Sequence, residues 1–480
     1  RETSAMRSLA ILFILFLLGG CQKPPKPLPS VKESRELVVV THNGPATYYV
    51  NGQKEFAGFE YDLAKLFAQD LSAELGQEVR LKIVLVENVS QVIPALIQGK
   101  AHIAAANLSI TRPRQHLVRF GPAYQTVQQQ VVYNKEKGRQ PSKVHDLAGA
   151  NIAIPTGTSY AERLNEAAAN TPDLHWAEEQ RVNSEELLER VADGTLDYTI
   201  ADSHLVSMVQ NYYPNLGAGL NFGKKDELAW AFRKSGDEWL YQQAQKYFSR
   251  IKKDGTLRIL LDRYYGHSER VNPMDVTGFL IKLRTVLPRY VDLFKQAEEL
   301  TDIDWRLLAA ISYQESHWDP FATSPTNVRG MMMLTEETAD RMGVSNRLDP
   351  TQSIMAGARY MIVLKETIPE RVAEPDRTWL ALAAYNIGYA HLEDARVLAQ
   401  RLKLNPDAWA DVKKTLPLLT REEYFSTIQY GYARGGAPVH FVESIRTYYR
   451  ILEKYEQKHV PILPGFELIS AQSWGASPLH

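Results

Sequence analysis

The hydrophobic pattern of the chain changes near residue 267, and this change constrains the possible folds more than any other feature. Before it, short apolar runs typical of buried strands alternate with helical stretches; the runs are 37–40, 81–86, 102–106, 150–155 and 196–202, and the helices include 61–68 and 92–99. This alternation indicates an α/β unit with a largely parallel sheet. After it, strand patterns almost vanish, and helical periodicity dominates the segments 291–300, 304–315, 353–364, 378–386 and 441–452. The sequence therefore predicts a multidomain protein in which an all-α domain follows an α/β domain.

The 480 residues exceed what one typical core accommodates, so we expect more than one domain. Residues 36–267 form the expected α/β domain, and the polar segment 268–280 is the expected linker. Residues 281–460 form the expected all-α domain. Residues 461–480 contain scattered glycine, proline and serine, which predicts a poorly ordered tail.

The N-terminal region has the pattern of a secretory signal. The apolar run Leu9–Leu18 follows Met6-Arg7 and is too short to span a bilayer as a stable helix. Cys21 is the only cysteine, so it cannot form an intramolecular disulfide. The alternative to a cleaved signal is that this apolar run is a short uncleaved anchor and that the cysteine after it occurs by chance. The proline-rich residues 22–35 predict an extended tether.

The motif L-G-G-C, which ends at Cys21, resembles the lipobox of bacterial lipoproteins. This resemblance implies that residues 1–21 are a lipoprotein signal cleaved before an acylated cysteine, and several acyl chains would anchor the chain stably to a membrane. Gln22 takes the place of aspartate, which by the same resemblance favours the inner leaflet of the outer membrane of a Gram-negative cell. We therefore expect the protein to face the periplasm.

The charge balance excludes some classes of function. The chain has 55 basic and 56 acidic side chains, so it has no net field that would recruit nucleic acid. The sequence contains no metal-ligand cluster, no P-loop and no dinucleotide fingerprint, so we expect no metal and no cofactor.

Five segments of the first domain carry a recognisable pattern: 58–62 (G-F-E-Y-D), 99–114, 120–124, 146–159 and 193–202. In this order they resemble the periplasmic amino-acid-binding proteins that serve ABC importers. The resemblance implies two α/β lobes that are joined by a hinge and close on a ligand. The ligand would be an amino acid or a short peptide, for example a muropeptide.

The same resemblance implies which residues contact the ligand. Arg114 matches the arginine that holds the ligand carboxylate, since a guanidinium makes a two-point bond with a carboxylate. Asp202 matches the residue that takes the ligand amino group. The other implied contacts come from two loops: Asn107, Ser109, Thr158 and Ser159. The alternative is a domain that kept the fold and lost its ligand, with Arg114 and Asp202 as surface charges.

In the second domain, Glu315 lies at the end of an apolar helical run. Ile311 and Leu308 precede it by four and seven residues, so the glutamate shares their side of the helix. We expect this helix to start near 301–302 and to end before 319–320, which places Glu315 in the last turn. Lost hydration and the negative end of the helix dipole should both raise its pKa. A carboxylic acid that stays protonated near neutral pH can act as a general acid.

Helix geometry alone leaves a second interpretation open, in which a buried Glu315 pairs with Arg329 or Arg359. The motifs that follow favour catalysis. The segments 315–339 (E-S-H-W-D-P-F-A-T-S-P-T-N-V-R-G-M-M-M-L-T-E-E-T-A) and 381–390 (A-L-A-A-Y-N-I-G-Y-A) resemble the catalytic domain of soluble lytic transglycosylases, which is related to goose-type lysozyme.

This resemblance implies cleavage of the β-1,4 bond between N-acetylmuramic acid and N-acetylglucosamine in the glycan strands of peptidoglycan. The reaction would not use water and would leave a 1,6-anhydromuramic acid end. Hydrolysing glycosidases usually need two carboxylates. Glu315 would be the only one here, giving a proton and then taking one back.

The resemblance also implies supporting residues for the glycan. Ser324 would orient the N-acetyl group and Tyr385 would lie near Glu315 or the sugar, while the remaining contacts are Met331, Met332 and Asn386. The alternatives are a core tyrosine with its hydroxyl satisfied and, for the two methionines, packing in the core. Two positions depart from the family pattern. Met333 replaces a glutamine, and Tyr432 replaces a glutamate. We expect Glu443, which lies close to Tyr432 in the chain, to be structural.

Two other functions stay open. One is a lysozyme-type muramidase that adds water, and the other is a non-catalytic receptor for glycan or amino acids. A hinged sensor and an enzyme in one chain also suggest the hypothesis that ligand closure of the first domain regulates the second.

Overall fold

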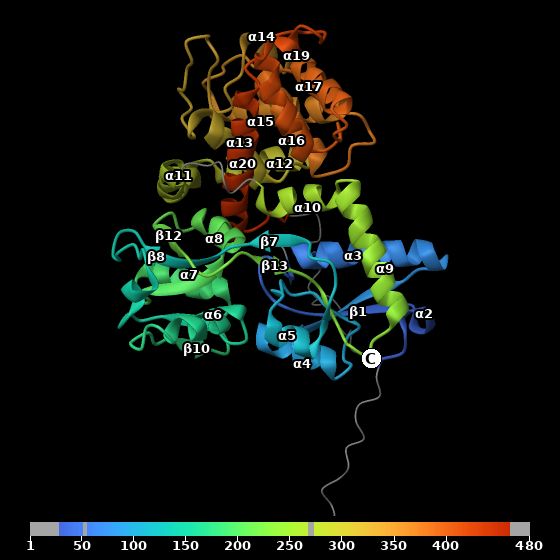
Figure 1. Ribbon diagram of the computed structural model, residues 1–480. Coiled ribbons are helices and arrows are strands. Elements are labelled where there is room, and N and C mark those ends of the chain that lie inside the picture. The colour runs from blue at the N-terminus through green and yellow to red at the C-terminus, as the bar shows by residue number, and fades with distance from the viewer. Residues whose placement is uncertain (1–27, 51–54, 267–272, 461–480) are drawn as a thin grey trace, which may run out of the picture. The chain divides into compact units, whose positions relative to one another are not determined.

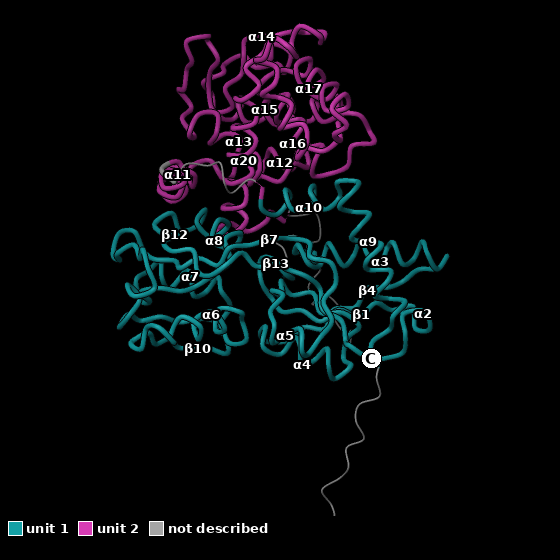
Figure 2. The backbone as a smooth tube through the Cα atoms, in the orientation of Figure 1, with its two compact units in different colours: residues 1–265 teal, residues 266–480 magenta. Residues whose placement is uncertain are grey.

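The structure is a computed structural model that describes residues 28–50, 55–266 and 273–460. The chain divides into two compact units at Tyr265 and Gly266 (Figure 2). The expected signal peptide with Cys21 and the expected tail 461–480 lie outside the described residues.

In unit 1 the first lobe is built on a five-stranded sheet with the order β4-β1-β5-β14-β6. The strands are β1 (Glu36–His42), β4 (Arg80–Val86), β5 (Ile103–Ala104), β6 (Arg119–Phe120) and β14 (Ala231–Phe232). Strand β1 pairs in parallel with β4 and β5, whereas β14 is antiparallel to its neighbours. The helices of this lobe are α2 (Val31–Ser34), α3 (Phe59–Leu75), α4 (Val92–Ile97), α5 (Arg112–Leu117), α9 (Glu238–Lys253) and α10 (Thr256–Tyr265), with a 3-10 turn at Val89–Gln91 and a small hairpin of β2 (Tyr49–Val50) and β3 (Phe56–Ala57).

The alternation of side chains along β1 explains how this sheet is covered. Leu37 and Val39 belong to one core cluster with residues of α3 and α9, whereas Val38 and Val40 belong to another with residues of α4. Successive side chains of a strand point to opposite faces, so a strand buried on both faces reads as a continuous apolar run. The run L-V-V-V therefore marks a central strand.

The second lobe contains β8 (Gln129–Asn134) between β11 (Tyr198–Asp202) and β12 (Leu216–Asn221), and β8 pairs antiparallel with both of them. Beside them β9 (Ala153–Pro155) pairs in parallel with β10 (Ala177–Glu179). The helices of this lobe are α6 (Ser159–Ala168), α7 (Ser184–Asp193) and α8 (Ser203–Gln210), with a 3-10 turn at Val144–Leu147.

The chain passes between the lobes at β7 (Gln125–Val127) and returns at β13 (Asp226–Leu228), which pair antiparallel (Figure 1). The predicted two-lobed α/β fold is confirmed. The expectation of a largely parallel sheet is wrong for the second lobe, because β8 enters from this hinge and β12 returns toward it in the opposite direction.

Unit 2 is helical, as predicted. Its helices are α11 (Pro273–Thr285), α12 (Val291–Thr301), α13 (Trp305–Ser316), α14 (Glu336–Arg341), α15 (Pro350–Thr367), α16 (Asp376–Ile387), α17 (Tyr389–Arg401), α18 (Trp409–Thr415), α19 (Glu422–Phe425) and α20 (Gly436–Tyr455), with 3-10 turns at Leu287–Arg289 and Leu416–Thr420. Helix α20 packs against both α13 and α16, so its long apolar side forms the centre of this unit.

Three boundary expectations need correction. The tether 22–35 ends in α2, where Val31 is fully buried in the first lobe. The linker 268–280 is helical from Pro273, because apolar side chains such as Phe279 are buried on one side of α11. Helix α13 starts at Trp305 and is capped by Asp304, whereas Asp302 is the left-handed residue that ends α12.

Candidate active site and ligand cleft

Helix α13 presents Glu315 in its last turn. The Asp304 carboxylate accepts a hydrogen bond from the backbone N–H of Arg306 at 2.9 Å and so begins the helix. His317 and Trp318 both have left-handed backbone conformations, with φ of 54° and 59°, and turn the chain away directly after the glutamate. The indole Nε1 of Trp318 donates to the Ala309 carbonyl at 2.8 Å, which ties this turn back to the helix.

The carboxyl of Glu315 is half-buried, and within the described residues no hydrogen bond or ion pair reaches it. Burial alone raises the pKa of Glu315 from 4.5 to about 8. Arg359 is exposed and neither it nor Arg329 pairs with the glutamate, so the described contacts do not support the ion-pair interpretation. The surrounding protein removes hydration from the carboxyl without replacing it, and such a group holds its proton near neutral pH.

The loop at Met331 and Met332 lies against this helix through its backbone. The Tyr385 hydroxyl donates to the Met332 carbonyl at 2.8 Å, and the Met332 N–H donates to Ser353 Oγ at 3.1 Å. Both methionine side chains are fully buried, so the expectation that they line a sugar groove is corrected: they pack in the core. Adjacent Gly357 permits this packing, since a Cβ there would lie 2.7 Å from the Met332 side chain.

The other predicted glycan residues differ in their contacts and in whether they lie close to Glu315. Tyr385 lies close enough to Glu315 for the carboxylate to raise its phenolic pKa, after the larger effect of burial. The Ser324 hydroxyl accepts from the Val328 N–H at 3.1 Å, so it stabilises its own turn. Asn386 is exposed at the end of α16. The described contacts place Tyr385 next to Glu315 and provide no contact between the other two residues and the acid.

The positions that depart from the family pattern have clear structural settings. Met333 is half-buried with a left-handed backbone, φ 47°. Tyr432 is 56% exposed and packs edge-on against Phe425. Glu443 is fully buried and accepts hydrogen bonds from Trp409 Nε1 at 2.6 Å and from Arg446 at 3.0 Å, which makes it a structural residue as expected.

In unit 1 a pocket lies between the two lobes, and three of the six predicted ligand contacts line it: Asn107, Thr158 and Asp202. Arg114 does not line it and is only 7% exposed. Its guanidinium donates to the carbonyl oxygens of Ser109 at 3.1 Å and of Gly157 at 2.9 Å. In this structure Arg114 therefore joins the two lobes, and the hydroxyls of Ser109 and Ser159 lie 3.2 Å apart beside it.

Asp202 is the polar group of this pocket that most needs a partner. It is 5% exposed, and its Oδ1 has no hydrogen-bond partner within the part of the chain that the structure describes. Burial raises the pKa of Asp202 to about 7, with a further contribution from the carboxylate of Asp226 and an opposing one from Arg114. Asp226 itself pairs with Arg163 at 2.7 Å. The pocket therefore contains one buried carboxyl suited to an ammonium group.

Sequence reasoning missed the residue that holds Asn107. The buried carboxylate of Glu60 accepts hydrogen bonds from the Asn107 N–H at 2.8 Å, from Trp230 Nε1 at 2.8 Å and from the Tyr124 hydroxyl. Asn107 has a left-handed backbone, φ 51°, which is uncommon without glycine. An acidic residue in the segment G-F-E-Y-D was the only available signal.

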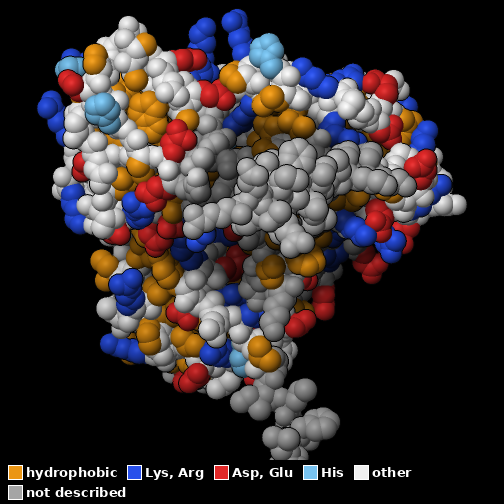
Figure 3. All heavy atoms as spheres, turned by 90° about the horizontal axis from the view of Figure 1, so that it is seen from below, with side chains coloured by type: hydrophobic (Ala, Val, Ile, Leu, Met, Phe, Trp, Pro, Cys, Tyr) orange, Lys and Arg blue, Asp and Glu red, His pale blue; other side chains and the backbone are white. Residues whose placement is uncertain are grey.

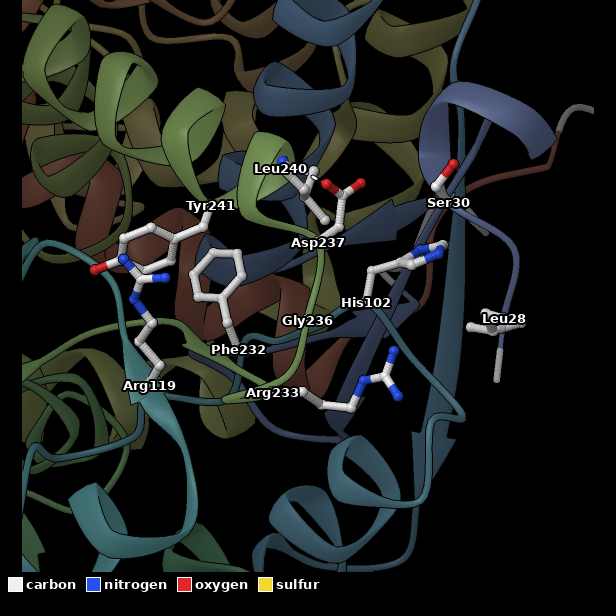
Figure 4. Close-up of a pocket in the computed structure, with 10 residues that line it drawn as sticks. All are labelled: Leu28, Ser30, His102, Arg119, Phe232, Arg233, Gly236, Asp237, Leu240 and Tyr241. Atoms are coloured by element: carbon white, nitrogen blue, oxygen red, sulfur yellow. Dashed lines mark hydrogen bonds between the residues drawn. The ribbon is translucent and has the colours of Figure 1, made fainter. Parts of the chain in front are cut away.

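A second pocket in the first lobe contains none of the predicted residues (Figure 4). Leu28 and Ser30 lie on one side, where His102 Nε2 is 2.9 Å from the Pro29 carbonyl. On the other side the Arg119 guanidinium lies 3.4 Å from the centre of the Tyr241 ring and pairs with Glu238. The His102 contact fastens the start of the described chain to the lobe, and the Arg119 contacts join β6 to α9.

Several general properties of the described residues bear on function. They contain no group of three or more His, Cys, Asp or Glu side chains that could hold a metal ion. No helix among them has the length and apolar character needed to cross a membrane. On the face in Figure 3 basic and acidic side chains are interspersed.

Comparison with known proteins matches both halves of the chain. Residues 292–406 match the model of the transglycosylase SLT domain, and residues 37–267 match that of bacterial extracellular solute-binding proteins, family 3. The chain is 58% identical over 470 residues to a protein from Methylobacillus flagellatus named membrane-bound lytic murein transglycosylase F, with 98% of this chain and 99% of that protein covered. A protein of the same name from Nitrosospira multiformis is 48% identical, with 98% of each chain covered.

The chain belongs to the membrane-bound lytic murein transglycosylase F family. The predicted resemblances of the two domains are thereby confirmed, since the chain matches a solute-binding model and a transglycosylase model in this order. Among solved structures, the P235GK mutant of ArgBP from T. maritima is 22% identical, with a TM-score of 0.43 and with 49% of this chain and 97% of that chain covered. An ancestral arginine-binding protein bound to arginine is 23% identical, with a TM-score of 0.42 and with 48% and 98% covered.

Proposed function

We propose that this chain cleaves the β-1,4 bond between N-acetylmuramic acid and N-acetylglucosamine without water, leaves a 1,6-anhydromuramic acid end, and uses Glu315 as the only acid and base. Membership of the family makes the chain a peptidoglycan lytic transglycosylase. The observation that carries the finer proposal is the carboxyl of Glu315, which is half-buried, unpaired among the described residues and has a pKa of about 8.

The proposed reaction uses this carboxyl twice. The protonated Glu315 donates to the glycosidic oxygen as the bond breaks, and the N-acetyl oxygen of the substrate holds the anomeric carbon. The resulting carboxylate then takes the proton of the C6 hydroxyl, which attacks the same carbon and closes the anhydro ring. A pKa near the working pH suits both proton transfers.

The absence of a charged neighbour supports a single carboxyl. No second acidic side chain of the described residues contributes to the pKa of Glu315. Glycosidases that add water usually place two carboxylates across the bond, and each would influence the other. We further propose that Ser324 orients the N-acetyl group of the substrate, that Tyr385 tunes the acidity of Glu315, and that Asn386 contacts the glycan.

Mass spectrometry of purified sacculi digested by the wild type and by Glu315→Gln tests this proposal. We expect anhydro ends from the wild type and none from the variant, which should still bind the glycan because the change is nearly isosteric. Reducing ends would select the lysozyme-type reaction. Unchanged cleavage by Glu315→Gln would exclude this residue as the acid.

For unit 1 we propose an amino acid or a peptide as the ligand, with its ammonium group on Asp202. Support comes from the buried unpartnered Oδ1 of Asp202 in the pocket between the lobes. Arg114 would have to exchange its Gly157 carbonyl for the ligand carboxylate. Calorimetric titration of the chain with single amino acids and with stem peptides tests this, with Asp202→Asn as the variant expected to lose binding.

We also propose that ligand binding in unit 1 changes the rate of murein cleavage. Equal rates of murein cleavage with and without a ligand that binds would contradict this proposal.

For the location we propose acylation of Cys21 and anchoring in the inner leaflet of the outer membrane. Membrane fractionation of the wild type and of Cys21→Ala, with mass spectrometry of the N-terminus, tests the anchor.

A further inference from the structure

Two serine hydroxyls of α13 converge on one carbonyl oxygen of the neighbouring loop. Ser312 Oγ donates to the Met331 carbonyl at 3.0 Å. Ser316 Oγ donates to the same oxygen at 2.8 Å, which is shorter than its 3.1 Å distance to the Ser312 carbonyl. A carbonyl oxygen has two lone pairs, so these two bonds satisfy it completely. Ser312 and Ser316 are both buried, and both belong to the turn of the helix that carries Glu315.

The direction of these hydroxyls is informative. Side chains three positions apart on a helix are neighbours, so Ser312 lies on the same side of α13 as Glu315. A serine there could donate to the carboxylate. Its hydroxyl instead bonds Met331, and the nearby Tyr385 hydroxyl similarly bonds the Met332 carbonyl at 2.8 Å. The hydroxyls of Ser312 and Tyr385 are therefore both directed at loop carbonyls, and neither donates a hydrogen bond to the acid.

A second buried glutamate in the same chain shows the opposite arrangement. Glu60 accepts hydrogen bonds from a tyrosine hydroxyl, an indole N–H and a backbone N–H, and each of these lowers its pKa against the effect of burial. Glu315 has no such donor, and only burial acts on it. Glu60 is fully buried and Glu315 is half-buried, so both carboxyls lose hydration, and the two sites also differ in the donors available to them.

We propose that Ser312 and Ser316 are positioning residues for the reaction of Glu315: by bonding the Met331 carbonyl they fix the acid-bearing turn to the loop and keep hydrogen-bond donors and water away from the carboxyl. This inference rests on the proposed role of Glu315. Without the two hydroxyls the Met331 carbonyl would be left unsatisfied in a buried place, which draws in water or moves the loop. Either change brings donors to Glu315.

The test compares Ser312→Ala combined with Ser316→Ala against Thr415→Val in the full chain. Thr415 is also fully buried in unit 2, and its hydroxyl donates to the Ala395 carbonyl at 2.7 Å. This bond joins α18 to α17 and does not involve α13. For each protein the rate of product release from sacculi is measured from pH 5 to pH 9, together with the thermal midpoint.

We expect the alkaline fall of the rate to move to lower pH by about one unit in the serine variant, because added donors stabilise the ionised carboxyl. We also expect a roughly fivefold lower rate at pH 8, because the protonated fraction of the carboxyl falls from about one half to about one tenth. Thr415→Val should lose a similar amount of stability and keep the wild-type pH profile. An unshifted profile in the serine variant, with a stability loss like that of Thr415→Val, overturns the proposal.

Two further measurements keep the test decisive. If the double variant does not fold, Ser316→Thr, which keeps a hydroxyl, is compared with Ser316→Ala. Recovery of the wild-type profile by threonine supports the positioning role, and equal shifts in both variants contradict it. A failure of the proposed function itself has a different signature, because the wild type would then yield no anhydro product or Glu315→Gln would remain active.

Discussion

Replacement of Glu315 by glutamine should stabilise the protein at neutral pH while it abolishes cleavage. The carboxyl has a pKa of about 8 in the folded chain and 4.5 as its ordinary value. Between these two values the unfolded chain has lost the proton and the folded chain keeps it. Folding must then take up a proton, so the free energy of unfolding falls as the pH rises through this interval.

The magnitude follows from the same two values. At pH 7 the interval from 4.5 is about 2.5 units, and at about 1.4 kcal/mol per unit the carboxyl costs up to about 3.5 kcal/mol of stability. A neutral glutamine removes this cost. For a unit of this size the gain corresponds to a rise of the thermal midpoint by roughly 7 to 14 °C. Below about pH 4.5 the carboxyl is protonated in the folded and in the unfolded wild type. The thermal midpoints of the wild type and of Glu315→Gln should then differ least.

Differential scanning calorimetry of the two chains at half-unit steps from pH 4 to pH 8.5 measures this difference. Glu366→Gln is a matched control, since Glu366 is an exposed glutamate in α15 of the same unit. Its thermal midpoint should follow that of the wild type at every pH. If the curves of Glu315→Gln and the wild type run parallel from pH 4 to pH 8, the carboxyl is not desolvated and its assignment as a proton donor fails.

Three other predictions follow from individual contacts. Gly330→Ala should destabilise the chain by more than about 1 kcal/mol in thermal unfolding, because φ is +87° and an added Cβ would lie 1.9 Å from the Arg347 carbonyl oxygen. Tyr385→Phe should cost about 1–3 kcal/mol and lower the rate of murein cleavage, since the Met332 carbonyl loses its hydroxyl donor; a variant with wild-type stability and rate would contradict this. The affinity of unit 1 for an amine-bearing ligand should fall as the pH drops below 7, because Asp202, with a pKa of about 7, must be ionised to hold an ammonium group; a titration that shows constant affinity from pH 5 to pH 8 would exclude Asp202 as the amine partner.

The sequence was informative where a property depends on neighbours along one element. The spacing of Leu308, Ile311 and Glu315 predicted a desolvated carboxyl in a last helical turn, and the structure has one. The same reasoning could not predict that the backbone carbonyls of Met331 and Met332 would accept hydrogen bonds from side-chain hydroxyls while the two methionine side chains are buried. That arrangement depends on contacts between helices far apart in the chain, which no local pattern encodes.

Three buried or half-buried glutamates illustrate why residue type alone does not decide function. Glu443 accepts hydrogen bonds from Trp409 and Arg446, so its charge is balanced and it stabilises the core of unit 2. Glu60 is surrounded by three donors and orders a loop of unit 1. Glu315 alone of these three has no described partner, so its pKa rises to about 8, and a carboxyl with a pKa near the working pH can both donate and accept a proton. Under the proposed role of Glu315, its capacity to transfer a proton therefore depends on the absence of donors around one carboxyl, and contacts between remote segments of the sequence determine that absence.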